Sequence, residues 1–450
     1  PQRRQRKKPP KPVWDLATFE VPEEPGQTRF HDLDLPDELM HAIYDLSFRY
    51  CSPIQASILP YTLQGLDAIG KAQTGTGKTA AFALPILQRL AADRPPLKKR
   101  SPRALILTPT RELANQIGAS IKAYGRYLHV SHTAVYGGVS IVPQSRALSR
   151  GVDILVATPG RLLDLMSQRL LFLDRLELFT LDEADRMLDM GFIHDVKKII
   201  AAIPETRQTL FFSATMSNDA VRLADQLLKN PVRVQVSPVY STAQKVEQKV
   251  LFVERHNKEA LLLNLLEDET INRALIFTRT KHKANNIARK LNRNQVQAEA
   301  IHGNKSQSAR MQALRNFSAG RARVLVATDV ASRGIDIKGV SHVINFEMPN
   351  EPESYVHRIG RTARAGAAGI AISFCATDEL AFLGSIEKLT NIALPVDVEH
   401  PYHSEQAAKG PRNGLSKTKA SFGRYRKRGN FGAQRRSFRP GRKTAARTSL

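Results

Sequence analysis

The chain has 450 residues, of which 67 are Lys or Arg and 42 are Asp or Glu, and its formal net charge is +25. With 42% hydrophobic residues and two cysteines, the composition is that of globular domains with reduced thiols, and it excludes a disulfide framework. No apolar run reaches the roughly 18 residues of a membrane-spanning helix, so we expect a cytoplasmic protein with no membrane partner.

Much of the positive charge lies at the two ends of the chain. Residues 1–12 carry six Lys or Arg and residues 409–450 carry fourteen, and neither segment contains an acidic residue. The 396 residues between them carry a net charge of only about +5. A central region in which positive and negative charges nearly cancel, flanked by basic ends, is typical of a protein that binds a polyanion.

The first part of the chain predicts a basic arm followed by an α/β domain. Residues 1–29 lack any periodicity and are expected to form a disordered basic arm. In residues 30–236, short aliphatic runs alternate with segments of helical character, which predicts a mainly parallel sheet covered on both faces. The expected strands are residues 67–70, 104–108, 153–158, 178–181 and 209–213.

The second part repeats this organisation. Residues 237–245 are polar, contain Pro238 and are predicted to be a linker. The alternation resumes in residues 246–400 and predicts a second α/β domain, whose expected strands are residues 274–278, 298–302, 323–328, 342–346 and 370–374. Residues 401–450 are rich in Gly, Ser, Lys and Arg and predict a disordered basic tail.

A glycine-rich segment, residues 72–79 (AQTGTGKT), lies between an expected strand and an expected helix. The backbone N–H groups of such a loop surround phosphate oxygens, and the helix N-terminus adds its dipole. Lys78 would reach the β- and γ-phosphates of a nucleotide, and Thr79 would offer its hydroxyl to Mg²⁺. Ala72 stands where the general pattern has its first Gly. The alternative is a glycine-rich turn without function.

The acidic tetrapeptide of residues 182–185 (DEAD) directly follows an expected strand. Carboxylates at the carboxyl ends of sheet strands lie where α/β sheets bind ligands. Asp182 suits a Walker-B role toward Mg²⁺, and Glu183 is placed to orient or deprotonate the attacking water. Alone, the tetrapeptide would more often be a solvated helix start, but the phosphate loop upstream favours the catalytic interpretation.

A basic segment of the second domain, residues 357–364 (HRIGRTAR), offers arginines for the γ-phosphate. Phosphoryl transfer needs positive charge on the oxygens that gain charge in the transition state, and arginine fingers supply it. Because these arginines lie on the other domain, the site would be complete only when the domains close. The alternative is a basic helix end on the surface.

These motifs and their order identify a resemblance to the DEAD-box RNA helicases of superfamily 2, most closely the bacterial RhlE/RhlB group, over about residues 28–388. The resemblance implies two tandem RecA-like domains that bind ATP and Mg²⁺. It also implies RNA-stimulated ATP hydrolysis coupled to local unwinding of short RNA duplexes or RNP remodelling. RNA would be held through its backbone, independently of sequence. Whether the partners belong to ribosome assembly or to RNA degradation stays open.

The resemblance assigns the residues around ATP. Gln55 would bond the N6/N7 edge of adenine and Phe30 would stack on its ring, although Phe30 alone would be read as a core residue. The phosphate loop would contact ATP through Ala72, Gln73, Thr74, Gly75, Thr76, Gly77, Lys78 and Thr79. Asp336 would contact the ribose, and Gly334 would lie near the phosphates. The implied catalytic residues are Lys78, Asp182, Glu183, His357, Arg361 and Arg364, and the implied metal ligands are Thr79 and Asp182.

The family motifs also assign RNA contacts and a coupling element. The implied RNA-binding residues are Thr110, Arg111, Gly138, Thr158 and Arg161 in the first domain and Gln307, Arg310 and Thr328 in the second. Asp185, Ser213 and Thr215 would couple the ATP state to domain closure. Two positions depart from the common family form: Cys51 replaces a Pro, and Ala363 replaces a Gly.

Two other functions remain open from the sequence alone. One is a DNA-directed helicase of the same superfamily, since the preference for RNA rests on the resemblance. The other is a non-catalytic RNA annealer or scaffold that acts through its tails. In the predicted tail, aromatic residues lie between arginines, a composition that suits sequence-independent RNA binding. A merely solubilising tail and a tail that docks a partner protein are the alternatives.

Overall fold

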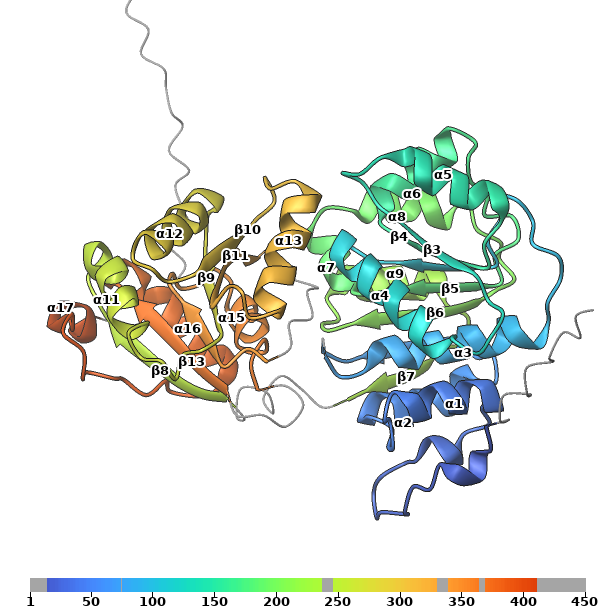
Figure 1. The fold of residues 1–450 in the computed structure, drawn as a ribbon, viewed down its shortest axis with the longest axis horizontal. Coiled ribbons are helices and arrows are strands. Elements are labelled where there is room, and N and C mark those ends of the chain that lie inside the picture. The colour runs from blue at the N-terminus through green and yellow to red at the C-terminus, as the bar shows by residue number, and fades with distance from the viewer. Residues whose placement is uncertain (1–13, 74, 237–245, 330–338, 364–368, 411–450) are drawn as a thin grey trace, which may run out of the picture. The chain divides into compact units, whose positions relative to one another are not determined.

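A computed structural model describes residues 14–73, 75–236, 246–329, 339–363 and 369–410. These residues form two parallel β-sheets, each covered by helices on both faces, as the alternating aliphatic runs predict (Figure 1). Both sheets belong to one compact unit of the chain. Within the described ranges, no helix combines the length and the apolar character needed to cross a bilayer.

The first sheet has seven strands in the order β3-β4-β2-β5-β6-β1-β7, and every neighbouring pair is parallel. Its two faces pack against separate apolar cores: Ala104 and Ile106 of β2 face one core, and Leu105 and Leu107 face the other. The strands are β1 (Ala68–Lys71), β2 (Ala104–Leu107), β3 (His132–Val135), β4 (Ile154–Ala157), β5 (Leu178–Leu181), β6 (Gln208–Ser213) and β7 (Val232–Gln235).

Helices cover both faces of this sheet. One core is completed by α1 (Asp37–Asp45), α2 (Pro53–Thr62), α3 (Lys78–Ala92) and α4 (Arg111–Tyr124). The other is completed by α5 (Ile141–Arg150), α6 (Pro159–Ser167), α7 (Ala184–Asp189), α8 (Ile193–Ile200) and α9 (Asn218–Leu227). Two short 3₁₀ helices, η1 (Leu16–Thr18) and η2 (Phe30–Asp32), precede them.

The second sheet has six strands in the order β10-β11-β9-β12-β13-β8, again all parallel. Its strands are β8 (Val246–Phe252), β9 (Ala274–Thr278), β10 (Ala298–Ile301), β11 (Val324–Thr328), β12 (His342–Asn345) and β13 (Gly369–Cys375). One face packs against α11 (Lys258–Leu265) and α12 (Lys281–Arg293). The other packs against α13 (Gln307–Ser318), α15 (Pro352–Ile359), α16 (Leu380–Thr390) and α17 (Glu405–Lys409). Two 3₁₀ helices, η3 (Arg255–Asn257) and η4 (Thr377–Glu379), complete this part.

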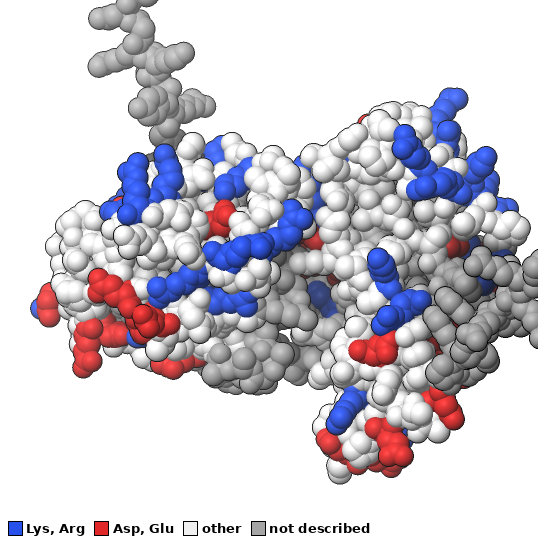
Figure 2. All heavy atoms as spheres, in the orientation of Figure 1, with Lys and Arg blue, Asp and Glu red and all other residues white. Residues whose placement is uncertain are grey.

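Charge is unevenly spread over the second sheet and its helices. In Figure 2, Lys and Arg side chains gather over the side that carries α12, whereas acidic side chains gather over the side of α11 and α17. The sequence of α12 contains five Lys or Arg and no acidic residue. The folded part of the chain therefore has a basic surface of its own, apart from the basic ends.

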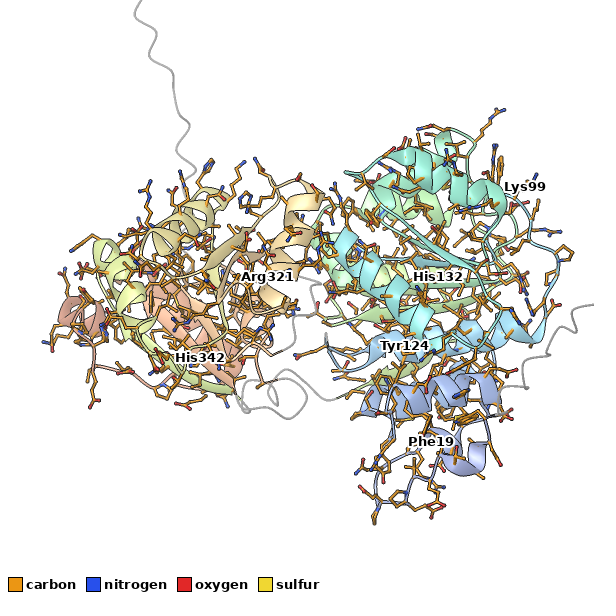
Figure 3. The ribbon with its side chains drawn as sticks, in the orientation of Figure 1. Phe19, Lys99, Tyr124, His132, Arg321 and His342 are labelled. Carbon is orange, nitrogen blue, oxygen red and sulfur yellow. The ribbon has the colours of Figure 1, made fainter. Side chains whose placement is uncertain are left out.

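Residues 14–29 correct the prediction of a disordered arm over residues 1–29. Trp14 stacks on His41 with ring centroids 4.7 Å apart, and Phe19, marked in Figure 3, is buried together with Val21 in the first core. These apolar side chains follow no helical or strand period, so the sequence pattern concealed them. Their burial nevertheless favours an ordered segment. Residues 1–13 lie outside the described residues.

Residues 401–410 likewise correct the prediction of a tail that is disordered from residue 401. Ala407 of α17 is fully buried, and the backbone N–H of Ser404 donates to the carbonyl of Phe252 over 3.0 Å. The folded part of the chain thus extends about ten residues further than expected. The rest of the predicted tail, residues 411–450, and the predicted linker, residues 237–245, lie outside the described residues.

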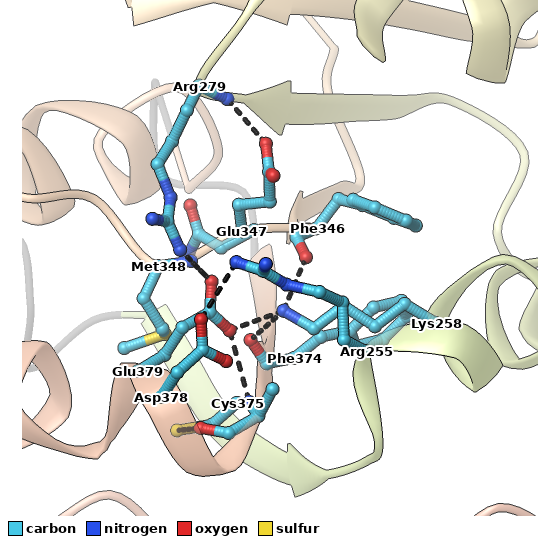
Figure 4. A network of polar contacts seen from close by, with 12 residues as sticks. Arg255, Lys258, Arg279, Phe346, Glu347, Met348, Phe374, Cys375, Asp378 and Glu379 are labelled. Atoms are coloured by element: carbon cyan, nitrogen blue, oxygen red, sulfur yellow. Dashed lines mark hydrogen bonds and ion pairs between the residues drawn. The ribbon is translucent and has the colours of Figure 1, made fainter. Parts of the chain in front are cut away.

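A buried ion-pair network joins the carboxyl ends of three strands in the second sheet (Figure 4). The Nζ of Lys258 donates to the carbonyls of Phe346 (3.0 Å) and Phe374 (3.3 Å) and forms an ion pair with Glu379. Glu379 forms a second ion pair, with Arg279, which directly follows β9. The network ties α11 and η4 to β9, β12 and β13.

Candidate active site

The glycine-rich loop lies between β1 and α3, as its sequence predicts. Gly77 is the N-terminal cap of α3 and has a φ of +92°, and Gly75 has a φ of +88°. A Cβ atom at Gly77 would lie 2.5 Å from the Nε2 of Gln55. Both the backbone conformation and the close neighbour therefore require glycine there. Thr74 lies outside the described residues.

Lys78 opens α3 and is only 6% exposed. Within the described part of the chain, its Nζ is buried and has no hydrogen-bond partner. A buried ammonium group without a partner is costly, unless a ligand supplies negative charge. Thr79 follows on the same first turn, half-buried. The loop thus has the features of a site for a phosphate group.

Asp182 and Glu183 follow the carboxyl end of β5, and both are buried. The Oδ1 of Asp182 accepts a 3.0 Å hydrogen bond from the backbone N–H of Glu183. Glu183 has a left-handed backbone (φ +53°), which turns the chain sharply into α7. Burial raises the pKa of Asp182 to about 6, although the nearby positive charge of Lys78 acts in the opposite direction. Ionisation of the buried Asp182 carboxyl group is therefore unfavourable without added positive charge, which a bound cation would provide.

Glu183 forms a buried ion pair with Arg186 of α7, with 2.7 Å between its Oε2 and the arginine Nη1. Burial alone would raise the pKa of Glu183, but the charges of Arg186 and Lys78 outweigh it and the pKa is lowered. Glu183 is therefore held as a carboxylate, the form that accepts a proton or orients water. Sequence reasoning missed Arg186, although its spacing of three residues from Glu183 on a helix was a usable signal.

Asp185 links the DEAD segment to the segment after β6. Its Oδ2 accepts hydrogen bonds from the backbone N–H (2.7 Å) and the hydroxyl (2.9 Å) of Thr215 and from the N–H of Ala214 (3.1 Å). The hydroxyl of Ser213 accepts from the backbone N–H of Asp185 over 3.2 Å and donates to the carbonyl of Thr215. The three residues assigned to coupling are thus in direct contact.

Gln55 lies in α2 beside the phosphate loop. Its Oε1 accepts from the backbone N–H of Ser52 (2.8 Å), and its Nε2 donates to the carbonyl of Gly77 (2.9 Å). Phe30, in contrast, is 0% exposed and packs in the first core, with its ring 6.4 Å from that of Phe48. This placement agrees with the alternative of a core residue rather than with a ring that is free to stack. Ala72 is buried, while Gln73 and Thr76 are half-buried.

The RNA-contact residues of the first domain occupy loop ends and helix starts. Thr110 caps α4, and Thr158 occupies the N-cap position of α6. The guanidinium of Arg111 lies against Gly138, which has a φ of +78°. Arg161 donates to the carbonyl of Val139 over 3.1 Å. Each of these residues lies in a loop that follows the carboxyl end of a strand of the first sheet, or in the first turn of the helix after that loop.

Two of the three RNA-contact residues assigned to the second domain are engaged with Glu112 of α4. The Nε2 of Gln307 lies 2.9 Å from one carboxylate oxygen of Glu112, and the Nη2 of Arg310 lies 3.1 Å from the other. Glu112 itself is buried. The sequence did not indicate this contact, because the partners are almost 200 positions apart. The third assigned residue, Thr328, ends β11 and is buried.

His357 and Arg361 line a cavity of about 420 Å³. The remaining walls of the cavity are Glu183, Asp185, Arg186, Asp189, Ala214, Thr215, Met216, Ser217, Glu351 and Glu353. The DEAD segment, the coupling segment and the basic segment thus share one cavity. Three further assigned residues, Gly334, Asp336 and Arg364, lie outside the described residues.

Arg358, inside the same basic segment, has a role that the sequence did not reveal. It is 1% exposed, forms two hydrogen bonds with the carboxylate of Asp329, and donates to the side chain of Asn345 over 3.1 Å. These contacts fix α15 to the carboxyl ends of β11 and β12. Ala363, which replaces the common Gly, has a φ of +53°.

Comparison with known proteins agrees with this arrangement of motifs. The DEAD/DEAH box helicase model matches residues 52–223, and the helicase conserved C-terminal domain model matches residues 257–366. The ATP-dependent RNA helicase RhlB of Pseudomonas putida is 48% identical over 374 residues, which cover 82% of this chain and 94% of that protein. The DEAD-box ATP-dependent RNA helicase CshA of Bacillus cereus is 44% identical over 363 residues, which cover 81% of this chain and 68% of that protein.

Solved structures agree with the fold. Saccharomyces cerevisiae Dbp5 bound to RNA and ADP BeF3 aligns with a TM-score of 0.73 and 30% identity over 82% of this chain and 96% of that one. Mss116p bound to ssRNA and AMP-PNP aligns with a TM-score of 0.75 and 28% identity over 86% of this chain and 82% of that one. The two α/β domains are therefore RecA-like, as the resemblance implied.

Proposed function

This chain belongs to the DEAD-box family of ATP-dependent RNA helicases, and we propose that it couples RNA-stimulated ATP hydrolysis to local unwinding of short RNA duplexes or to RNP remodelling. The observation that carries the proposal is the direct contact of Asp185 with Thr215, in the same segment as Asp182 and Glu183, on which the charge of the buried Lys78 acts. It supports a nucleotide site whose state is transmitted to a neighbouring segment. A cytoplasmic location is part of the proposal.

Lys78 would hold the β- and γ-phosphates of ATP. The buried Nζ makes no hydrogen bond within the described residues, which supports this role, because phosphate oxygens would accept hydrogen bonds from it. Thr79 and Asp182 have the hydroxyl and carboxylate oxygens that Mg²⁺ prefers, and they would hold that ion. Bound Mg²⁺ would neutralise charge on the phosphate oxygens. The raised pKa of Asp182 is consistent with a group that ionises more readily beside a cation.

Glu183 would position the water that attacks the γ-phosphate. Its ion pair with Arg186 supports the role, because it holds the carboxylate charged and fixed in direction. His357, Arg361 and Arg364 would place positive charge and hydrogen-bond donors at the γ-phosphate in the closed state. The position of His357 and Arg361 on the wall shared with Glu183 supports this assignment.

RNA would be held along its backbone by the loop-end residues of the first domain and by Thr328, Gln307 and Arg310 of the second. The relatives bound to RNA, Dbp5 and Mss116p, support RNA as the ligand. Because Gln307 and Arg310 also bind Glu112, they would join RNA binding to the relative arrangement of the two domains.

The deciding experiment compares ATP hydrolysis by the full chain and its Glu183→Gln variant with RNA and with DNA of the same sequence. We expect strong stimulation by RNA, weak stimulation by DNA, and retention of ATP binding without turnover in the variant. Equal stimulation by DNA would favour the DNA-directed helicase. A variant that keeps full biological activity without turnover would favour a non-catalytic scaffold.

The RNA that the protein binds in its native cell would indicate the machinery to which it belongs. Crosslinking the protein to RNA in its native cell and sequencing the bound fragments distinguishes the two machineries proposed for it. Precursors of ribosomal RNA would support a role in ribosome assembly. Fragments of messenger RNA at decay sites would support a role in RNA degradation.

A further inference from the structure

Helix α12 carries a row of basic and polar side chains on its solvent side. His282, Asn286, Arg289 and Arg293 follow one another at spacings of four, three and four residues, and all four are exposed. This spacing places them on one side of a helix. The side chains that face the sheet are Ala284, Ile287, Ala288 and Leu291. We refer to the four exposed residues as the α12 ridge.

The two arginines of the α12 ridge are not neutralised by the folded chain. Lys283 and Lys290, at the margin of the ridge, share Glu259 of α11 at 2.7 and 2.8 Å. Arg289 instead donates to Asn286, and within the described ranges neither Arg289 nor Arg293 has an acidic partner. Their positive charges are therefore available to an external anion.

The start of α12 contacts the segment that leads to the RNA-assigned residues of α13. His302, at the end of β10, is buried, and its Nε2 lies 2.9 Å from the side-chain oxygen of Asn285 in α12. Burial, together with the charges of Lys305, Lys281 and Arg310, lowers the pKa of His302. The start of α12 thus lies beside the loop that leads to α13, the helix that carries Gln307 and Arg310.

The dimensions of the ridge suit a nucleic-acid strand. From His282 to Arg293 the helix rises about 16 Å, comparable with about five successive phosphates of one stacked strand. The ridge contains no aliphatic side chain and no Phe, Tyr or Trp, whereas protein interfaces rely on such anchors at their centre. Contacts to a phosphate backbone need only cations and polar donors.

We propose that the α12 ridge is a further RNA-binding surface, which holds the phosphate backbone of RNA that extends beyond the segment bound by the motif residues. This inference rests on the proposed function. It adds a folded, helical contact that is independent of the basic tail. It also makes the length of the RNA, in addition to its presence, a determinant of affinity.

The test is RNA-stimulated ATP hydrolysis by the full chain with Arg289→Glu and Arg293→Glu combined. RNA is titrated at several salt concentrations, once as a short single strand and once as a strand several times longer. On long RNA, we expect the half-stimulating concentration to rise several-fold, and the log–log salt slope to fall by about 1.4 because two phosphates are no longer neutralised. On short RNA, and in saturated turnover on either RNA, we expect no change.

The control is a double variant with the same change in net charge, Arg255→Glu and Lys388→Glu, both exposed positions on other helices of the second domain. An equal shift in the control would mean that net charge alone is responsible and would overturn the proposal. Unchanged titrations of the ridge variant would also overturn it, and would favour an acidic protein as the partner of α12. A neutral pair, Arg289→Gln and Arg293→Gln, should show a smaller shift of the same sign. If the unmodified chain showed no RNA stimulation at all, the proposed function itself would fail.

Discussion

Arg358 and Asp329 form a two-point ion pair, with 2.6 Å from the arginine Nε to Oδ1 and 2.7 Å from Nη2 to Oδ2. The Arg358 side chain is 1% exposed and that of Asp329 is 25% exposed, so loss of the arginine leaves a mostly buried carboxylate without this counter-charge. We expect Arg358→Met to lower the free energy of unfolding by about 3–5 kcal/mol, measured by urea denaturation. Arg358→Lys should lose less stability than Arg358→Met but more than none, because an ammonium group cannot contact both carboxylate oxygens of Asp329 as a guanidinium does.

A matched control for this prediction is Arg255→Met. Arg255 and Asp378 are 2.8 Å apart, but both side chains are largely exposed. An exposed pair contributes about 0–1 kcal/mol, so the control should be close to the unmodified protein. A comparable loss in both variants would contradict a special role for the buried pair.

Lys78→Ala should abolish ATP hydrolysis and duplex separation without destabilising the fold. The Nζ of Lys78 makes no hydrogen bond within the described residues, so its removal breaks none. The change relieves the burial of one charge but also takes positive charge away from Asp182 and Glu183, and we therefore expect the midpoint of thermal unfolding without nucleotide to change little. Normal turnover in the folded variant would overturn the assignment of the phosphate loop.

Ala363→Gly should stabilise the protein by about 0.5–1 kcal/mol, because a left-handed backbone is unfavourable for a residue with a Cβ atom. The gain is limited, since glycine also increases the freedom of the unfolded chain. Asn391, which has a similar φ of +52°, provides a comparison, because asparagine tolerates that conformation better. Asn391→Gly should change the unfolding midpoint less than Ala363→Gly does.

Stability should increase with pH in the range where histidines lose their protons. Burial lowers the pKa of His132 in β3 and His342 in β12, both marked in Figure 3, and of His302 and His400, below the ordinary value of 6.5. Near and below that value, the unfolded chain binds more protons than the folded one. The stabilisation is therefore complete above about pH 6.5 and is lost as the pH falls toward the lowered pKa values.

Urea denaturation at about pH 5.5 and about pH 7.5 tests this pH dependence. We expect a larger free energy of unfolding at the higher pH, and the difference should be at most about 1.4 kcal/mol per histidine and pH unit. His342→Gln should reduce the difference between the two pH values. An unchanged difference in that variant would show that His342 does not contribute to the effect.

Deletion of residues 411–450 should weaken RNA binding without lowering saturated ATP turnover. The segment carries thirteen Lys or Arg and the aromatic residues Phe422, Tyr425, Phe431 and Phe438, but no motif residue. The deletion begins at residue 411 because α17 ends at Lys409. In ATPase titrations at several salt concentrations, the slope should fall by about 0.7 for each RNA phosphate that the shortened chain no longer neutralises. Superimposable titrations would instead favour a tail that docks a protein.

The sequence predicted the buried strands better than the edge strands. All ten expected strands correspond to observed ones, but β3, β7 and β8 were not anticipated. Each of these three lies at the edge of a sheet, where residues such as Arg233 and Glu247 can face solvent. An edge strand is covered only in part and so lacks the continuous aliphatic run that reveals a central parallel strand.

The site was predictable where it follows local chain order and not where it depends on distant contacts. The phosphate loop and the DEAD segment are continuous, and each follows a strand, so their position could be read directly. The contact of Glu112 with Gln307 and the burial of Phe30 depend on how remote segments pack. No periodicity or spacing in the chain encodes such packing.

The amide of Gln55 cannot turn over. The backbone N–H of Ser52 requires an oxygen at one end, and the carbonyl of Gly77 requires an NH₂ group at the other. One lone pair on Oε1 and one N–H on Nε2 of Gln55 therefore remain for a ligand, and these two atoms cannot exchange places. Adenine presents a donor beside an acceptor and matches that order, whereas guanine presents two acceptors and would set its O6 against the amide oxygen. The backbone N–H of Ser52 and the carbonyl of Gly77 would thus decide the discrimination between the two purines, although neither group needs to touch the base.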